Sequence, residues 1–87
     1  MLIPRLATTK EGTPATLSSL DRAMKAKGFN RTDSSDATEI QWKKGDMELT
    51  LAKGKDWTCA IVTRLKEGIK EALGMQFMEE GSAIVVD

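Results

Sequence analysis

The sequence predicts an α+β fold in which two helices pack on one face of a three-stranded antiparallel meander. Apolar residues first recur every three or four positions, then alternate with polar residues between positions 39 and 62, and finally return to the helical period. Short apolar segments at the two ends of the chain, residues 2–6 and 83–86, can extend the sheet and pair with each other. The predicted order is therefore β-α-β-β-β-α-β.

The first helix is predicted at residues 14–27. Thr13 supplies an N-cap hydroxyl, and Pro14 fits the first helical position, where its missing N–H is not needed. Gly28 can take the left-handed conformation that ends a helix, with Phe29 packing back on the last turn in a Schellman motif. Three apolar residues share one face of this helix: Leu17, Leu20 and Met24.

Three strands follow a loop predicted at residues 30–38, whose Asp and Ser side chains are expected to bond their own backbone rather than a metal. A two-residue turn at Lys44 and Gly45 places Trp42 opposite Met47, which brings the apolar residues of the first two strands to one face. The alternating apolar residues of the three strands are Ile40 and Trp42, then Met47, Leu49 and Leu51, then Trp57, Cys59 and Ile61.

The turn into the third strand leaves two alternatives open. A three-residue turn at residues 53–55 sets Leu51 opposite Trp57 and points the apolar residues of the third strand into the core. This register is favoured because a slip of one residue would move that whole set out of the core. A two-residue turn at residues 54–55 instead sends Trp57 and Ile61 to the outer face, where they form an exposed binding surface.

The second helix begins at Leu65, where the helical spacing returns, and its end is open between two glycines. If it ends at Gly74, residues 75–79 form a closing hairpin with residues 83–86. The alternative is a longer helix that stops at Gly81, which is favoured because Met, Gln and Glu are good helix formers. Residues 83–86 form an edge strand in both cases.

Composition excludes several classes of function. The chain holds no histidine and a single cysteine, Cys59, so it has no Ser-His-Asp or Cys-His group, no internal disulfide and no zinc site of cysteine and histidine. No catalytic residue, metal ligand or cofactor is predicted, and an enzyme is not expected. The apolar runs are far shorter than the about 18 residues of a membrane span. A single cytoplasmic domain, residues 1–87, is expected.

The leading hypothesis for function is a small protein-interaction module: an adaptor, regulator or inhibitor that binds another protein or forms a homodimer. Thirteen cations balance thirteen anions, which argues against strong nucleic-acid binding. Trp42 and Trp57 are interpreted as core residues rather than as stacking platforms.

The expected binding surface combines small residues of the outer sheet face with two methionines near the second helix. Its residues are Thr50, Ala52, Thr58, Ala60, Val62, Met75 and Met78. The alternative hypothesis is an RNA- or DNA-binding domain that uses the basic side of the first helix. The residues of that surface are Arg22, Lys25, Lys27 and Arg31.

Overall fold

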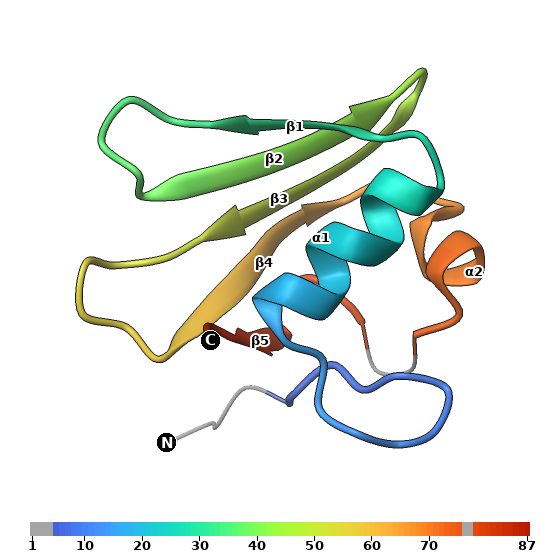
Figure 1. The fold of residues 1–87 in the computed structure, drawn as a ribbon, viewed down its shortest axis with the longest axis horizontal. Helices are drawn as coiled ribbons and strands as arrows, with labels where there is room; N and C mark the ends of the chain where they lie inside the picture. The colour runs from blue at the N-terminus through green and yellow to red at the C-terminus, as the bar shows by residue number, and fades with distance from the viewer. Residues whose placement is uncertain (1–4, 76–77) are drawn as a thin grey trace.

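The computed structural model describes residues 5–75 and 78–87 and has the predicted α+β class (Figure 1). Five antiparallel strands form one sheet in chain order, from β1 to β5. The elements are α1 (Leu17–Ala26), β1 (Asn30–Asp33), β2 (Glu39–Lys44), β3 (Met47–Ala52), β4 (Cys59–Leu65), α2 (Ile69–Leu73) and β5 (Ala83–Val85). The predicted arrangement, a meander with helices on one face and a last strand after the second helix, is confirmed.

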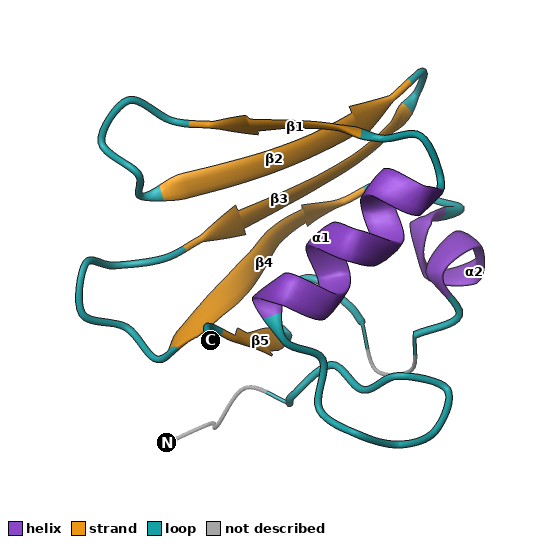
Figure 2. Cartoon of the chain, viewed as in Figure 1, coloured by secondary structure: helices purple, strands orange, loops and turns teal. Residues whose placement is uncertain are grey.

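The core lies between the sheet and the helices, and Figure 2 shows α1 in front of the sheet. Leu20 and Met24 of α1 are fully buried, as is Ile69 of α2, so both helices contribute to one core. Burying a large apolar side chain stabilises the fold by about 1.5–3 kcal/mol. The strands supply seven residues to this core cluster: Ile40, Trp42, Leu49, Leu51, Ala60, Val62 and Ile84.

The end of α1 is as predicted. Gly28 has a φ of +87°, the left-handed conformation that ends the helix. Its N–H donates to the carbonyl of Lys25 at 3.0 Å, and the N–H of Phe29 donates to the carbonyl of Met24 at 3.0 Å. These two hydrogen bonds define a Schellman motif, and the buried Phe29 packs beneath the helix.

The predicted start of α1 is wrong by three residues. The N-cap is Thr16, whose hydroxyl accepts from the N–H of Ser19 at 3.1 Å in a capping box. Pro14 is bridged to Thr8, and the N–H of Ala15 donates to the carbonyl of Ala7 at 2.8 Å. Pairing with the N-terminal segment therefore holds Pro14 and Ala15 in an extended conformation, and the helix begins only at Leu17.

The predicted loop at residues 30–38 is wrong over its first four residues, which form β1. All four residues of β1 are exposed, so the strand has no alternation of apolar and polar residues that the sequence could show. β1 is a strand because its backbone pairs with β2. In the rest of the loop, the predicted bonds from the backbone to Asp and Ser side chains are present. Asp36 accepts from the N–H of Thr38 at 3.3 Å, and the hydroxyl of Ser34 accepts from the N–H of Glu39 at 3.0 Å.

The first hairpin turns at Gly45 and Asp46, one residue later than predicted, so that Trp42 lies opposite Leu49 instead of Met47. The partner of each β2 residue thus shifts by two residues along β3. Because side chains of a strand alternate between its faces, a shift of two leaves every side chain on its predicted face. The prediction that β2 and β3 share one apolar face is confirmed.

The favoured register of the second hairpin is wrong. Leu51 lies opposite Val62 instead of Trp57, and a six-residue loop at residues 53–58 joins the strands. A β-bulge beside Thr50 shifts the register once more within the pair. Ala60 and Val62 face the core, so Trp57 and Ile61 face outward, as in the other alternative.

The favoured long second helix is also wrong. Leu65 is the last residue of β4, and α2 is a single short helix that ends at Gly74, where φ is +64°. Met75 and Met78 are buried in the core, and no strand forms in the described part of residues 75–79. Residues 76 and 77 lie outside the described residues.

The two ends of the chain pair, as predicted. Leu6 forms a parallel bridge with Ala83, whose backbone exchanges hydrogen bonds of 2.9 Å with Arg5 and Ala7. The N–H of Val85 also donates to the carbonyl of Ala15 at 3.1 Å. The far edge of β5 is therefore covered. Residues 2–4 of the predicted first strand lie outside the described residues, and no helix among those described is long and apolar enough to cross a membrane.

Candidate protein-interaction surface

The sheet face that points away from α1 carries an apolar strip, which we define as Trp57, Cys59 and Ile61. Because successive side chains of a strand point to opposite faces, the burial of Ala60 and Val62 in the core turns Cys59 and Ile61 outward. Trp57 precedes β4 and lines the same shallow groove, of about 330 Å³, with both residues. This outer strip forms the centre of an apolar region on the exposed sheet face.

Trp57 dominates the outer strip, because 53% of its surface is exposed to solvent. Its indole rests on Gly54, where a Cβ atom would come within 2.6 Å of the indole Cδ1. The N–H of Trp57 also donates to the carbonyl of Gly54 at 3.4 Å. The missing side chain at position 54 thus lets the loop hold the aromatic ring against the backbone. A ring that is held before binding loses less conformational entropy when it binds.

Half-buried apolar residues of the adjacent strands continue the outer strip sideways. Ala52 of β3 lies opposite Ile61, and Val85 of β5 lies opposite Cys59. The loop at residues 53–58 adds both signs of charge beside the strip. Its charged residues are Lys53, Lys55 and Asp56. An apolar centre with a mixed polar rim is the usual anatomy of a protein interface.

The other half of the outer face is polar. Glu48 is only 9% exposed, and its carboxylate accepts from the side-chain amide of Gln41 and lies 3.6 Å from the Nε of Arg64. Thr50 is 6% exposed, and its hydroxyl has no hydrogen-bond partner among the described residues. The charge of Glu48 is thus compensated within the face, and the outer strip is its apolar region.

Few of the residues expected at the binding surface lie on it. Thr58 is exposed and lines the groove, and Ala52 borders it. Thr50 belongs to the polar half of the face. The remaining four are buried in the core: Ala60, Val62, Met75 and Met78. The prediction placed Ala60 and Val62 of β4 on the outer face, whereas these two residues face the core. The alternative register of the second hairpin did place Trp57 and Ile61 on the outer face.

The basic side of α1 is partly neutralised. Asp21 lies 3.0 Å from the Nζ of Lys25 and 3.5 Å from a guanidinium nitrogen of Arg31, and Asp33 lies 2.8 Å from the Nε of Arg31. Arg22 and Lys27 are exposed and form no ion pair among the described residues. Two of the four cations of the predicted nucleic-acid surface therefore already have carboxylate partners.

These contacts shift the titration of both carboxyl groups. Partial burial alone raises the pKa of Asp21, but hydrogen bonds from Lys25 and Trp42 and the nearby cations outweigh burial and hold the pKa below its ordinary value. The hydrogen bond from Arg31 is the main cause of the lowered pKa of Asp33.

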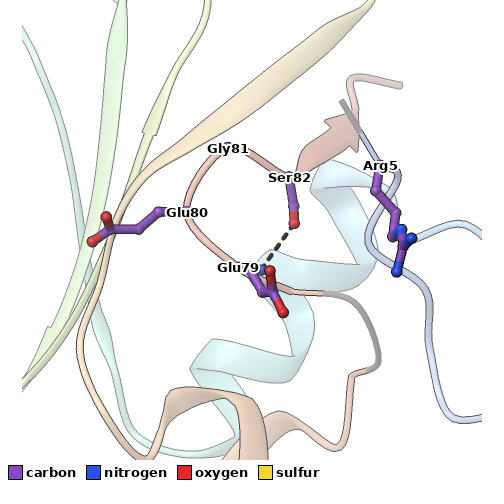
Figure 3. Close-up of a pocket in the computed structure, with 5 residues that line it drawn as sticks. All are labelled: Arg5, Glu79, Glu80, Gly81 and Ser82. Carbon is purple, nitrogen blue, oxygen red and sulfur yellow. Dashed lines mark hydrogen bonds between the residues drawn. The ribbon is translucent and has the colours of Figure 1, made fainter. Parts of the chain in front are cut away.

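A second hollow, of about 200 Å³, lies where the turn before β5 meets the N-terminal segment (Figure 3). Glu79 and Ser82 close this turn, with the Ser82 hydroxyl accepting from the N–H of Glu79 at 2.9 Å. Glu80 points away from Arg5 in Figure 3. The N–H of Gly81 already donates to the carbonyl of Val62 at 2.8 Å. The N–H groups of Glu79, Gly81 and Ser82 therefore already donate within the fold.

Among residues 5–75 and 78–87, no three His, Cys, Asp or Glu side chains gather as metal ligands. Cys59 is half-buried on the outer strip. No protein-family model, curated protein or solved structure matches the chain.

Proposed function

We propose that this chain is a non-enzymatic protein-interaction module of the cytoplasm that binds its partner through the outer strip. The observation that carries the proposal is Trp57, a large aromatic side chain held on Gly54 with 53% of its surface exposed. Tryptophan is among the residues that contribute most to binding energy at interfaces. Its neighbours Cys59 and Ile61 supply the apolar floor of the groove.

The chemistry of the outer strip favours a protein as partner. Burial of apolar surface contributes about 25 cal/mol for each Å² removed from water. A partner that presents an apolar side chain can fill the groove beside Trp57, while its polar residues meet Lys55 and Asp56 at the rim. The mixed charges of this rim offer no continuous track for a phosphate backbone.

Affinity capture with matched variants tests the proposal. The chain is immobilised as wild type, as Trp57→Ser and as Gly54→Ala, which keeps the indole but displaces it from its seat. Leu6→Ser is the control, because Leu6 is the other exposed large apolar residue within residues 5–75 and 78–87, at 38%, and lies outside the outer strip. We expect a protein that wild type and Leu6→Ser retain, with at least tenfold less retained by Trp57→Ser and an intermediate amount by Gly54→Ala.

Thermal unfolding of each variant checks that the fold is intact, since substitutions at the exposed Trp57 and Leu6 should change stability by only about 0.5 kcal/mol. Equal retention by wild type and Trp57→Ser, or no retained protein at all, would contradict the proposal.

The alternative function, RNA or DNA binding through Arg22, Lys25, Lys27 and Arg31, predicts a different result. Binding through phosphates weakens steeply with salt, so the logarithm of the affinity constant would fall linearly with the logarithm of salt concentration. The ion pairs that Asp21 and Asp33 make with Lys25 and Arg31 reduce the positive charge available for such binding.

A further inference from the structure

We propose that two copies of this chain associate through β1, which pairs with β1 of the second copy in antiparallel register centred on Thr32. The two five-stranded sheets then form one continuous sheet. This contact uses an edge of the sheet and not the outer strip, so it is independent of the function proposed above.

β1 is the open edge of the sheet. Figure 1 shows β1 at the upper border, with β2 on one side and no described strand on the other. The opposite edge, β5, is covered by the N-terminal segment through Arg5, Ala7 and Ala15. An uncovered edge strand presents unpaired backbone donors and acceptors to another strand.

The direction of these backbone groups follows from the β1–β2 ladder. The N–H of Ser34 donates to the carbonyl of Glu39 at 2.9 Å, in the same register as the strand pair. Because alternate residues of a strand bond to opposite neighbours, Thr32 also points its backbone groups toward β2. Arg31 and Asp33 therefore point theirs toward the free edge.

A register centred on Thr32 uses these groups. It sets Arg31 of each copy opposite Asp33 of the other, so that each such pair exchanges two backbone hydrogen bonds. Any register centred on Arg31 or Asp33 instead places one of these residues opposite itself, with like charges facing each other. Like charges directly opposite destabilise a strand pair.

The side chains are complementary to the same register. Arg31 and Asp33 already form an ion pair at 2.8 Å within one chain. In the paired strands each of them faces an opposite charge across the interface, and directly opposed ion pairs stabilise a sheet. Arg31 keeps its position because its guanidinium lies 5.7 Å above the ring of Trp42. The charge pattern of β1 thus fits a second copy of itself.

The two Thr32 residues face each other on the two-fold axis, in a pair without hydrogen bonds, where Cα atoms lie about 4.5 Å apart. That spacing falls within the about 4.4 to 6.8 Å that a disulfide spans. In a Cys59→Ala background, Thr32→Cys should therefore oxidise to a covalent dimer. Asn30→Cys is the matched control on the same exposed strand, because the two Asn30 Cα atoms would lie about 13 Å apart at about 3.3 Å per residue.

Sedimentation measures the association without a cross-link. A four-residue edge buries less than about 1,200 Å², so the dimer is expected to be weak and to form as concentration rises. Asp33→Lys places cations opposite Arg31 and should weaken dimerisation at least tenfold. Asp46→Lys makes the same charge change in an exposed turn outside the register and should leave dimerisation unchanged.

Three results overturn the proposal: a monomer at every concentration, equal cross-linking of Thr32→Cys and Asn30→Cys, or a dimer that Trp57→Ser abolishes and Asp33→Lys does not. The last result would assign self-association to the outer strip. Loss of partner binding in Trp57→Ser with an unchanged dimer would support the two surfaces separately.

Discussion

At the scale of single residues, the two tryptophans occupy opposite environments. Trp42 is fully buried, and its indole N–H donates to the carboxylate of Asp21 at 3.1 Å. The same carboxylate holds Lys25 and lies near Arg31, so one acidic side chain of α1 joins the helix to β1 and β2. Trp57, by contrast, rests on a glycine in a loop and faces solvent.

Removal of the Asp21 carboxylate should destabilise the fold. Asp21→Ala leaves the buried indole N–H of Trp42 without its acceptor, which costs about 1–3 kcal/mol. Urea unfolding followed by tryptophan fluorescence measures this loss. Arg22→Ala, a substitution at the exposed neighbour, serves as control and should change the free energy of unfolding by less than about 0.5 kcal/mol. Equal stabilities of the two variants would show that the hydrogen bond contributes little.

At the scale of elements, α1 ends by a local mechanism. Its last turn is closed by Gly28 in the left-handed conformation and by the backbone of Phe29. A Cβ atom at position 28 would meet only Lys44, at an ordinary contact distance of 3.6 Å. The need for glycine is therefore conformational and not steric.

Gly28→Ala should lower the free energy of unfolding by about 1–2 kcal/mol, because an L-residue with a side chain is strained in the left-handed region. Gly28→Asn should lose less, since asparagine tolerates this conformation better. Thermal or urea unfolding of the two variants against wild type checks the order. If Gly28→Ala matched wild type in stability, the Schellman ending would not be the reason for this glycine.

The elements also show what the sequence could predict. The end of α1 was predictable because Gly28, Phe29 and the carbonyls they cap lie within one turn of each other. Its start was not, because residues 14–16 pair with Thr8 and Val85, which no local pattern reveals. β1 was missed for a related reason, since its four exposed residues become a strand only through pairing with β2.

Prediction of the outer strip required knowing which residues of β4 face the core, and this was uncertain because consecutive residues of β4 are apolar. Cys59 and Ile61 alternate with Ala60 and Val62, and all four are apolar. The alternation of a strand is therefore satisfied whichever of the two pairs faces the core. The register that buries Trp57, Cys59 and Ile61 was favoured because a slip of one residue would move this whole apolar set out of the core. A six-residue loop and a bulge beside Thr50, which the sequence does not mark, instead buried the smaller residues. The types of α1 and of β2 to β4 were thus predictable, whereas the surface depended on one register.

At the scale of the whole molecule, the paired carboxylates set the response to acid. Asp21 and Asp33 have pKa values below those of the unfolded chain, so their ion pairs stabilise the fold at pH values above the unfolded pKa of about 3.9. This stabilisation is lost as the pH falls through the folded-state pKa values. No histidine is present to titrate between pH 5 and 8.

We therefore expect a nearly constant free energy of unfolding between about pH 5 and 8 and a steep decrease below about pH 4. Urea unfolding at a series of pH values measures the profile. Asp21→Asn should be less stable than wild type at neutral pH and should lose less on acidification. A rise in wild-type stability on acidification would contradict the assigned direction of the pKa shifts.

The contacts that join the N-terminal segment to β5 have a consequence for the order of events during folding. Ala83 bonds to Arg5 and Ala7, and the carboxylate of Asp87 accepts from the N–H of Ser18 at the start of α1. These contacts join segments that lie about 70 residues apart in the sequence, whereas short loops join each neighbouring pair of strands from β1 to β4. Contacts between distant segments form slowly, because a long loop must close first. The strands β1 to β4 can therefore pair early, and the edge of β5 is covered in a later step.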